Sequence, residues 1–130
     1  MEMSVTFVGG RKIEARFRDH TVITDQSLKE GGDNSAPTPF DLLLVSLANC
    51  AAYYVLKFCL ERKISIEGLS LGMNKEPDEK TKMLKKITIW IKLPPEFPEK
   101  YENAVVRAAE SCSVKKLLAQ PPDIETRVSR

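Results

Sequence analysis

The sequence predicts an α+β fold of one domain spanning residues 1–130, and three observations carry that prediction. Alternating apolar residues predict an antiparallel meander of strands within residues 3–24. A long apolar stretch over residues 39–62 then predicts a central helix. Beyond it, the apolar spacing changes to that of further antiparallel strands and a second helix, so hairpins and helices are segregated as in α+β proteins.

The meander is predicted from three short runs in which apolar and polar residues alternate. The first run covers residues 3–7, and Gly9-Gly10 supplies a hairpin turn before the return strand at residues 13–17. A third strand is expected at residues 21–24. The polar loop that follows, residues 25–38, leads to the central helix.

The central helix is predicted to begin with a capping box. Thr38 suits the N-cap, Pro39 suits the first helical position, and Asp41 can reach back to the N-cap. The helix would be about 36 Å long and is apolar on nearly every face, so it has to be covered on all sides. Because a few strands and one amphipathic helix cannot cover it alone, we expect a homodimer in which this helix contributes to the interface.

A transmembrane span is the competing interpretation of this helix. The uncharged run over residues 42–56 is shorter than the ~20 residues that a bilayer requires. It also contains four polar side chains: Ser46, Asn49, Tyr53 and Tyr54. We therefore expect a helix buried in protein and no membrane partner.

The second half of the chain is predicted to begin with two strands. Residues 64–73 suggest a strand with a shift in register near Gly68, and residues 74–82 suggest a charged loop. Alternation over residues 87–93 predicts the clearest strand of the chain, with a bulge or strand start near Leu84.

Two helices and a closing strand are expected to follow. The second helix begins at Pro98, and its evidence is one apolar stripe at helical spacing: Tyr101, Val105, Ala108 and Cys112. Ser113 then suits the N-cap of a short helix that ends before Pro121. Residues 124–128 have the pattern of a final strand.

Composition excludes several classes of protein. The 42% hydrophobic and 29% charged residues are typical of a soluble globular domain. A net charge of +2, without a basic cluster, gives no support for a nucleic-acid partner. Three cysteines and one histidine make a disulfide scaffold or a zinc site unsuited to this chain. The start of the chain lacks a signal-peptide pattern, so we expect a cytoplasmic protein with reduced thiols.

The three cysteines differ in what their positions predict. Cys59 lies among apolar residues and is expected to be a small buried hydrophobic side chain. Cys112 lies on the apolar stripe, but it also precedes a helix N-terminus, whose positive end lowers a thiol pKa. Cys50 lies in the middle of the central helix, so its activation would have to come from a neighbouring cation.

Two segments resemble the signatures of the OsmC/Ohr family, the osmotically induced and organic hydroperoxide resistance proteins. Residues 31–50, GGDNSAPTPFDLLLVSLANC, resemble the Gly-rich loop and proline that precede a long helix bearing the family's first cysteine. Residues 111–128, SCSVKKLLAQPPDIETRV, resemble the segment around its second cysteine. The Cys-Ser-Val form and the short length are most similar to the small YhfA-like redox-regulator subgroup.

The resemblance implies an OsmC-like intertwined homodimer with active sites at the subunit interface, and a thiol-dependent peroxidase acting on organic hydroperoxides. Cys50 matches the peroxidatic cysteine, whose thiolate attacks the peroxide and becomes a sulfenic acid. Cys112 matches the resolving cysteine, which closes a Cys50–Cys112 disulfide. A cellular dithiol would then reduce this disulfide, and no metal, flavin or haem cofactor is implied.

The resemblance also implies an arginine that activates the thiolate. The family's arginine follows a Gly-Gly pair, and Gly9-Gly10-Arg11 reproduces that arrangement. Arg11 is therefore the expected charge partner of Cys50. Arg16 and Arg18, on the return strand and after it, are weaker candidates.

One position departs from the family's pattern. Well-characterised peroxidases of the family place a Glu ten residues before the first cysteine, where it orients the arginine, whereas this chain has Phe40. The arginine would then need another carboxylate, such as Asp41 or Glu14. Phe40 and Tyr53 could instead line an apolar pocket suited to bulky hydroperoxides, and interface packing is the alternative role of Tyr53.

Two functions follow from these residues. The first is a peroxidase that uses Cys50, Cys112 and Arg11. The second is a non-enzymatic dimer of the same fold that binds an apolar ligand or partner through a degenerate peroxidase site. The two cysteines favour the first function, and Phe40 favours the second.

Overall fold

The computed structural model describes residues 2–130, which form two compact units, Met1–Val45 and Ser46–Arg130. The first unit holds the N-terminal meander and the loop after it, and the second holds the remaining strands and helices. The long helix α1 begins in the first unit and continues through the second. The α+β class predicted from the sequence is confirmed.

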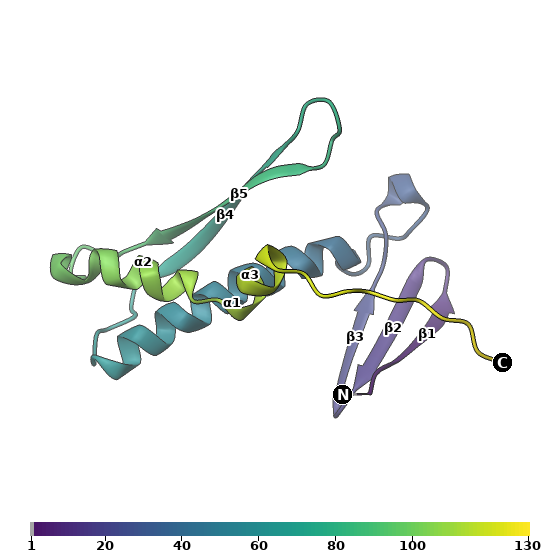
Figure 1. The fold of residues 1–130 in the computed structure, drawn as a ribbon, viewed down its shortest axis with the longest axis horizontal. Coiled ribbons are helices and arrows are strands. Elements are labelled where there is room, and N and C mark those ends of the chain that lie inside the picture. Colours follow the sequence, from purple (N-terminus) through teal and green to yellow (C-terminus); the bar gives the residue numbers. More distant parts are fainter. Residues whose placement is uncertain (1) are drawn as a thin grey trace. The chain divides into compact units, whose positions relative to one another are not determined.

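The meander of the first unit is a three-stranded antiparallel sheet (Figure 1). Its strands are β1 (Ser4–Gly9), β2 (Lys12–Phe17) and β3 (His20–Thr24), in the order β1-β2-β3. The alternation that predicted them places apolar residues opposite one another, because Phe7 pairs with Ile13 and Val5 with Ala15. After β3 the loop contains one short 3₁₀ turn, η1 (Leu28–Glu30).

The helix α1 spans Pro39–Glu61 and starts with the predicted capping box. The Asp41 backbone N–H donates to Thr38 Oγ1 over 3.1 Å, and the Thr38 N–H donates to Asp41 Oδ2 over 3.0 Å. At the other end, Lys63 adopts a positive φ of 55° and the Ile64 N–H caps the Cys59 carbonyl over 2.9 Å. Ile64 therefore closes the helix rather than beginning a strand.

The second unit contains a long hairpin formed by β4 (Ser70–Pro77) and β5 (Leu84–Lys92). The predicted start of β4 at residue 64 is wrong, because residues 64–69 close α1 and turn at Gly68, whose φ is +78°. The predicted loop at residues 74–82 is also too long, since β4 continues to Pro77. The strand start near Leu84 is confirmed, with a register shift where Pro77 faces it.

Two short helices follow the hairpin and lie along α1 (Figure 1). A 3₁₀ turn, η2 (Glu99–Tyr101), starts after Pro98 and continues into α2 (Glu102–Glu110). The helix α3 spans Ser113–Ala119. Its N-cap is Cys112 rather than the predicted Ser113, because the Lys115 N–H donates to Cys112 Sγ over 3.4 Å.

The predicted final strand at residues 124–128 is wrong for a single chain. Residues 121–130 form no helix or strand, and Ile124 and Val128 are 88% and 91% exposed. A strand needs the backbone N–H and C=O groups of a neighbour. No strand among the described residues offers those groups to this segment.

The core of the second unit lies between α1, α2 and one face of the hairpin. Its fully enclosed members are shared by the two helices and the segment between β5 and η2: Ala51, Val55, Phe58, Cys59, Phe97, Val105 and Ala109. Apolar side chains of β4 and β5, among them Leu71 and Ile89, pack against this cluster. The core therefore fixes the middle of α1 against the segment that carries Cys112.

Only one side of α1 is covered within a single chain. Its buried residues all belong to the side that faces the core, whereas Tyr53 and Leu60 are 57% and 64% exposed. By length and composition α1 is also the one helix among the described residues that could cross a membrane, with a mean hydropathy of 1.7. The same properties are found in core helices of soluble proteins.

Candidate functional site

The structure brings Cys50 and Cys112 together inside the second unit. Cys50 projects from the middle of α1, and Ser113 Oγ, at the start of α3, lies 3.6 Å from its sulfur. Cys112 is buried at the N-cap of α3, where its sulfur accepts the Lys115 N–H and lies 3.9 Å from the Leu47 carbonyl oxygen on α1. All three cysteines are free thiols. The two predicted redox cysteines thus form one site at the junction of α1 and α3.

The environment of Cys50 favours its thiolate. Burial acts to raise the pKa of the Cys50 thiol, but hydrogen bonds to the charged sulfur outweigh burial and lower its pKa to about 7. The donors are the backbone N–H groups of Val114 and Ser113 and the side chains of Cys112 and Ser113. About half of the Cys50 population would therefore be the nucleophilic thiolate near neutral pH.

Cys112 is shifted in the opposite direction. Burial raises the pKa of the Cys112 thiol, and its hydrogen bond to Cys50 raises it further, against the opposing effect of the Lys115 and Val114 N–H groups. Cys112 accordingly stays protonated when Cys50 is charged, and its hydrogen bond then stabilises the charged Cys50 sulfur. The Leu47 carbonyl oxygen, 3.9 Å away, is the other acceptor of the Cys112 S–H. The pair has one nucleophile and one proton donor.

This geometry corrects two expectations from the sequence. The prediction that only a cation could activate Cys50 is wrong, because the first turn of α3 brings backbone N–H groups to a thiol in the middle of another helix. The prediction that the same helix end would lower the pKa of Cys112 is also wrong, since burial dominates there. The contribution of Ser113 was missed, because its position after Cys112 suggested an N-cap.

Cys59 behaves as the sequence predicted. It is fully buried in the core, and burial raises the pKa of its thiol against the opposing charge of Arg62. The guanidinium of Arg62 lies 3.8 Å from the centroid of the Phe58 ring and covers this end of the core. Cys59 is therefore a packing residue with a suppressed thiolate.

The other predicted site residues lie in different parts of the chain. Arg11 is exposed in the turn between β1 and β2, and Phe40 is 51% exposed in the first turn of α1. Both belong to the first unit, so their pairing with Cys50 stays a prediction. Tyr53 lies one turn after Cys50 on α1.

Two weaker arginine candidates have other contacts. Arg16 Nε donates to Glu14 Oε2 over 3.1 Å. Glu14 is one of the two carboxylates suggested as a partner for Arg11, and this bond already engages it. The guanidinium carbon of Arg18 lies 5.8 Å from the centroid of the Phe17 ring. Arg11 makes no hydrogen bond, ion pair or ring contact with another residue in the range 2–130.

An apolar groove lies along α1, and Cys50 is not among the residues that line it. It has a volume of about 520 Å³ and lies between α1 and the segment leading into β4. Its walls are Ala48, Asn49, Ala52, Tyr53, Leu56, Ile66, Leu69, Ser70 and Leu71. Tyr53 is the one predicted pocket residue that lines it. The groove has the size and character of a small-ligand site.

No pattern in the sequence indicated that the carboxylate of Asp25 is buried. Asp25 is fully buried in the first unit and accepts hydrogen bonds from the N–H groups of Gln26, Asp33 and Ser35 and from Ser35 Oγ. These bonds, above all those from Ser35, hold its pKa well below the usual carboxyl range. The donors to Asp25 follow it by one to ten residues along the chain, so only the folded loop reveals the cluster.

Among residues 2–130, no three His, Cys, Asp or Glu side chains are grouped so that they could hold a metal ion.

Comparison with known proteins identifies the family. A model of the OsmC-like protein family matches residues 32–127, and the chain belongs to this family. In this chain the long apolar helix of the family's fold contributes one side to the core of the second unit. No curated protein sequence matches the chain.

Several solved structures share the fold. A candidate osmotic stress induced and detoxification response protein from Psychrobacter arcticus is 25% identical, with a TM-score of 0.74 over 88% of this chain and 85% of that one. An OsmC-like protein from Mycoplasma pneumoniae is 14% identical, with a TM-score of 0.71 over 92% and 87%. An organic hydroperoxide resistance protein OsmC from Legionella pneumophila is 18% identical, with a TM-score of 0.56 over 91% and 89%.

Proposed function

We propose that this protein is a thiol-dependent peroxidase that reduces organic hydroperoxides. The observation that carries the proposal is the Cys50 thiol, whose pKa is lowered to about 7 and which hydrogen-bonds to a second, protonated cysteine, Cys112. A nucleophilic thiolate beside a resolving thiol is the arrangement that peroxide reduction requires. Membership of the OsmC-like family, with a neighbour named for organic hydroperoxide resistance, supports the substrate class.

The proposed reaction has two steps in the protein. The Cys50 thiolate attacks the terminal oxygen of ROOH, the O–O bond breaks, and the leaving alkoxide takes a proton from water to give ROH. Cys50 is then a sulfenic acid. Cys112 loses its proton to the hydroxide that the first step leaves in solution, and its thiolate attacks the Cys50 sulfur. The S–O bond breaks and hydroxide leaves, which forms the Cys50–Cys112 disulfide. The two thiols have supplied the two electrons that reduce the peroxide.

An external cellular dithiol would return the pair to the reduced state by thiol–disulfide exchange, without a bound metal, flavin or haem. This cycle suits a cytoplasmic protein, where reduced dithiols are maintained. We further propose that Arg11 approaches the Cys50 thiolate and adds a positive charge to the effect of the hydrogen bonds.

We also propose that the active form is a homodimer. The exposed apolar side chains support it, since Phe7 on β1 and Ile124 near the C-terminus are each 88% exposed and the outer side of α1 is uncovered. A second copy would cover these surfaces and could offer a strand edge to residues 124–128. Size-exclusion chromatography with light scattering tests this: a monomer at micromolar concentration would contradict it.

The peroxidase proposal is tested by following consumption of cumene hydroperoxide with dithiothreitol as the reductant. Cys50→Ser is expected to abolish turnover, and Cys112→Ser is expected to leave a sulfenic acid that dimedone labels. Cys59→Ala is the matched control, because Cys59 is a buried thiol outside the site, and it should keep wild-type activity. Wild-type rates in both Cys50→Ser and Cys112→Ser would overturn the proposal.

The groove along α1 and the phenylalanine at position 40 favour a second candidate function, the binding of an apolar ligand without chemistry. Ala52→Trp would fill the groove while leaving both redox cysteines in place. Loss of binding of an apolar fluorescent probe, together with inert thiols in the wild type, would support this second function. Peroxide consumption that depends on Cys50 would reject it as the sole function.

A further inference from the structure

The Gly-Gly-Asp-Asn-Ser loop of the first unit is organised by one buried charge. Both carboxylate oxygens of Asp25 accept hydrogen bonds from the loop: Oδ1 from the Gln26 N–H over 2.8 Å, and Oδ2 from the Asp33 N–H and from the Ser35 N–H and hydroxyl over 3.2, 3.0 and 2.6 Å. The Asn34 N–H also donates to the Gln26 carbonyl over 3.0 Å. A buried carboxylate with this many donors holds the loop in one conformation.

Two glycines allow this conformation. A Cβ at position 32 would lie 2.1 Å from the Gln26 carbonyl oxygen and 2.8 Å from Asp25 Oδ1, so only glycine fits there. Gly31 adopts a φ of +85°, in the region that favours glycine. Both glycines therefore serve the loop's geometry.

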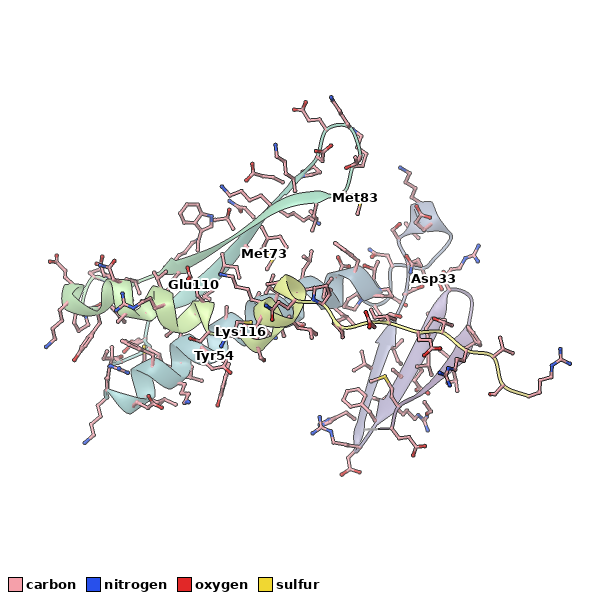
Figure 2. The ribbon with its side chains drawn as sticks, viewed as in Figure 1. Asp33, Tyr54, Met73, Met83, Glu110 and Lys116 are labelled. Carbon is pink, nitrogen blue, oxygen red and sulfur yellow. The ribbon has the colours of Figure 1, made fainter. Side chains whose placement is uncertain are left out.

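The loop holds the turn between β1 and β2 at two neighbouring positions. Lys12 Nζ pairs with Asp33 Oδ2 over 2.6 Å, and Asp33 stands on the loop after β3 (Figure 2). Next to it, the guanidinium of Arg11 occupies the place where a side chain at position 31 would be, since a Cβ there would lie 3.1 Å from Arg11 Nε and 3.2 Å from Nη2. The guanidinium fits there because Gly31 has no side chain.

The Arg11 guanidinium has a defined place but no partner for its N–H groups. Within residues 2–130, Arg11 has no hydrogen-bond or ion-pair partner. The two carboxylates of the loop after β3 have other donors, because Asp25 accepts from the Asp33 N–H and Asp33 accepts from Lys12. The guanidinium turns its Nε–Nη2 edge toward Gly31, because Nε and Nη2 lie nearer to the place of a Cβ than Cζ does, at 3.1 and 3.2 Å against 3.6 Å. The N–H donors of Nη1, on the opposite side of the guanidinium, are then the ones offered to an anion.

We infer that the Asp25-centred loop, residues 25–35, is a platform that positions the Arg11 guanidinium for an anionic partner, and this inference rests on the proposed role of Arg11 beside the Cys50 thiolate. The platform takes the place of the family glutamate that Phe40 replaces, because steric support from Gly31 and the neighbouring Lys12–Asp33 pair orients the turn without a carboxylate on Arg11 itself. Asp25 and Gly31 are thus positioning residues.

The test measures the pKa of the Cys50 thiol from the pH dependence of its alkylation by iodoacetamide, in the full chain. Gly31→Asn tolerates a positive φ but fills the place of the guanidinium, so it should raise the pKa by about one unit, a tenfold slower reaction at low pH. Gly10→Asn is the matched control, because Gly10 also has a positive φ of +57° but open space around its Cα. It should leave the pKa unchanged.

A second pair of variants tests the loop itself. Ser35→Ala removes the shortest bond to Asp25, whereas Ser27→Ala removes a 3.3 Å bond to the Glu30 N–H elsewhere in the same loop. Ser35→Ala should raise the pKa of Cys50, and Ser27→Ala should not. In an Arg11→Ala background neither Gly31→Asn nor Ser35→Ala should have a further effect, which a general loss of stability would not reproduce.

The outcomes separate this inference from the function on which it rests. If Arg11→Ala raises the pKa of Cys50 but Gly31→Asn does no more than Gly10→Asn, the platform is wrong and the role of Arg11 stands. If Arg11→Ala leaves the pKa unchanged, both the platform and the proposed role of Arg11 are overturned. If Arg11→Ala and Gly31→Asn each raise the pKa of Cys50, and the double variant raises it no further than Arg11→Ala alone, the platform is established.

Discussion

The hydroxyl of Ser113 should account for a measurable part of the activation of Cys50. The pKa of Cys50 is about 7 against an ordinary value of 9.0, and four donors, three of them on Ser113 and Val114, produce that difference. Because burial acts against the donors, they lower the pKa by at least about two units together, and an equal share is at least about half a unit for each donor. Ser113→Ala should therefore raise the pKa to about 7.5, which lowers the thiolate fraction at pH 6 from about 9% to about 3%.

The assay is the rate of Cys50 alkylation by iodoacetamide between pH 5 and pH 9, with each product located by peptide mass spectrometry. Ser113→Ala should react about threefold more slowly at pH 6 and at the wild-type rate above pH 9, and Ser113→Thr should restore the wild-type profile. Ser111→Ala is the control, because its hydroxyl donates to the Arg107 carbonyl instead. An unchanged profile in Ser113→Ala, or an equal shift in Ser111→Ala, would refute the reasoning.

Two further predictions concern stability. Val105→Ala should lower the free energy of unfolding in urea by about 2 kcal/mol, because the side chain is fully buried, whereas Val106→Ala, 47% exposed on the same helix, should change it little; equal effects would contradict the described core. The carboxylate of Asp25 has a depressed pKa in the folded state, so its stabilisation is complete above the ordinary carboxyl pKa of about 3.9 and is lost as the pH falls below it. Asp25→Asn should therefore be less stable than the wild type at pH 7 and lose less stability between pH 4 and pH 2; parallel urea midpoints over this range would contradict the role of the carboxylate.

Local patterns in the sequence predicted the elements whose structure depends on residues close together in the chain. The capping box of Thr38 and Asp41 depends on a spacing of three residues, and both of its hydrogen bonds form. The meander followed from alternation within short runs, and β5 followed in the same way. The end of α1 was read one residue too late and β4 too early, because Lys63 with its positive φ and the turn at Gly68 have no periodicity to reveal them.

Contacts between distant segments explain what the sequence could not predict. The pKa of Cys50 depends on N–H groups 63 and 64 residues later, and no spacing within either segment indicates that the first turn of α3 lies against α1. The cluster around Asp25 likewise depends on contacts between residues that are separated in the sequence, here by up to ten positions. The strand predicted at residues 124–128 rested on alternation alone, but a strand also needs an edge to pair with, and the described residues of one chain do not offer it.

The account depends most directly on Cys50 and Cys112 acting as a redox pair. The deciding measurement is a count of free thiols by mass spectrometry before and after one equivalent of cumene hydroperoxide. The account predicts the loss of two of the three thiols within minutes and a peptide that links Cys50 to Cys112, with Cys59 unchanged. No thiol lost, or a product that involves Cys59 instead, would contradict it.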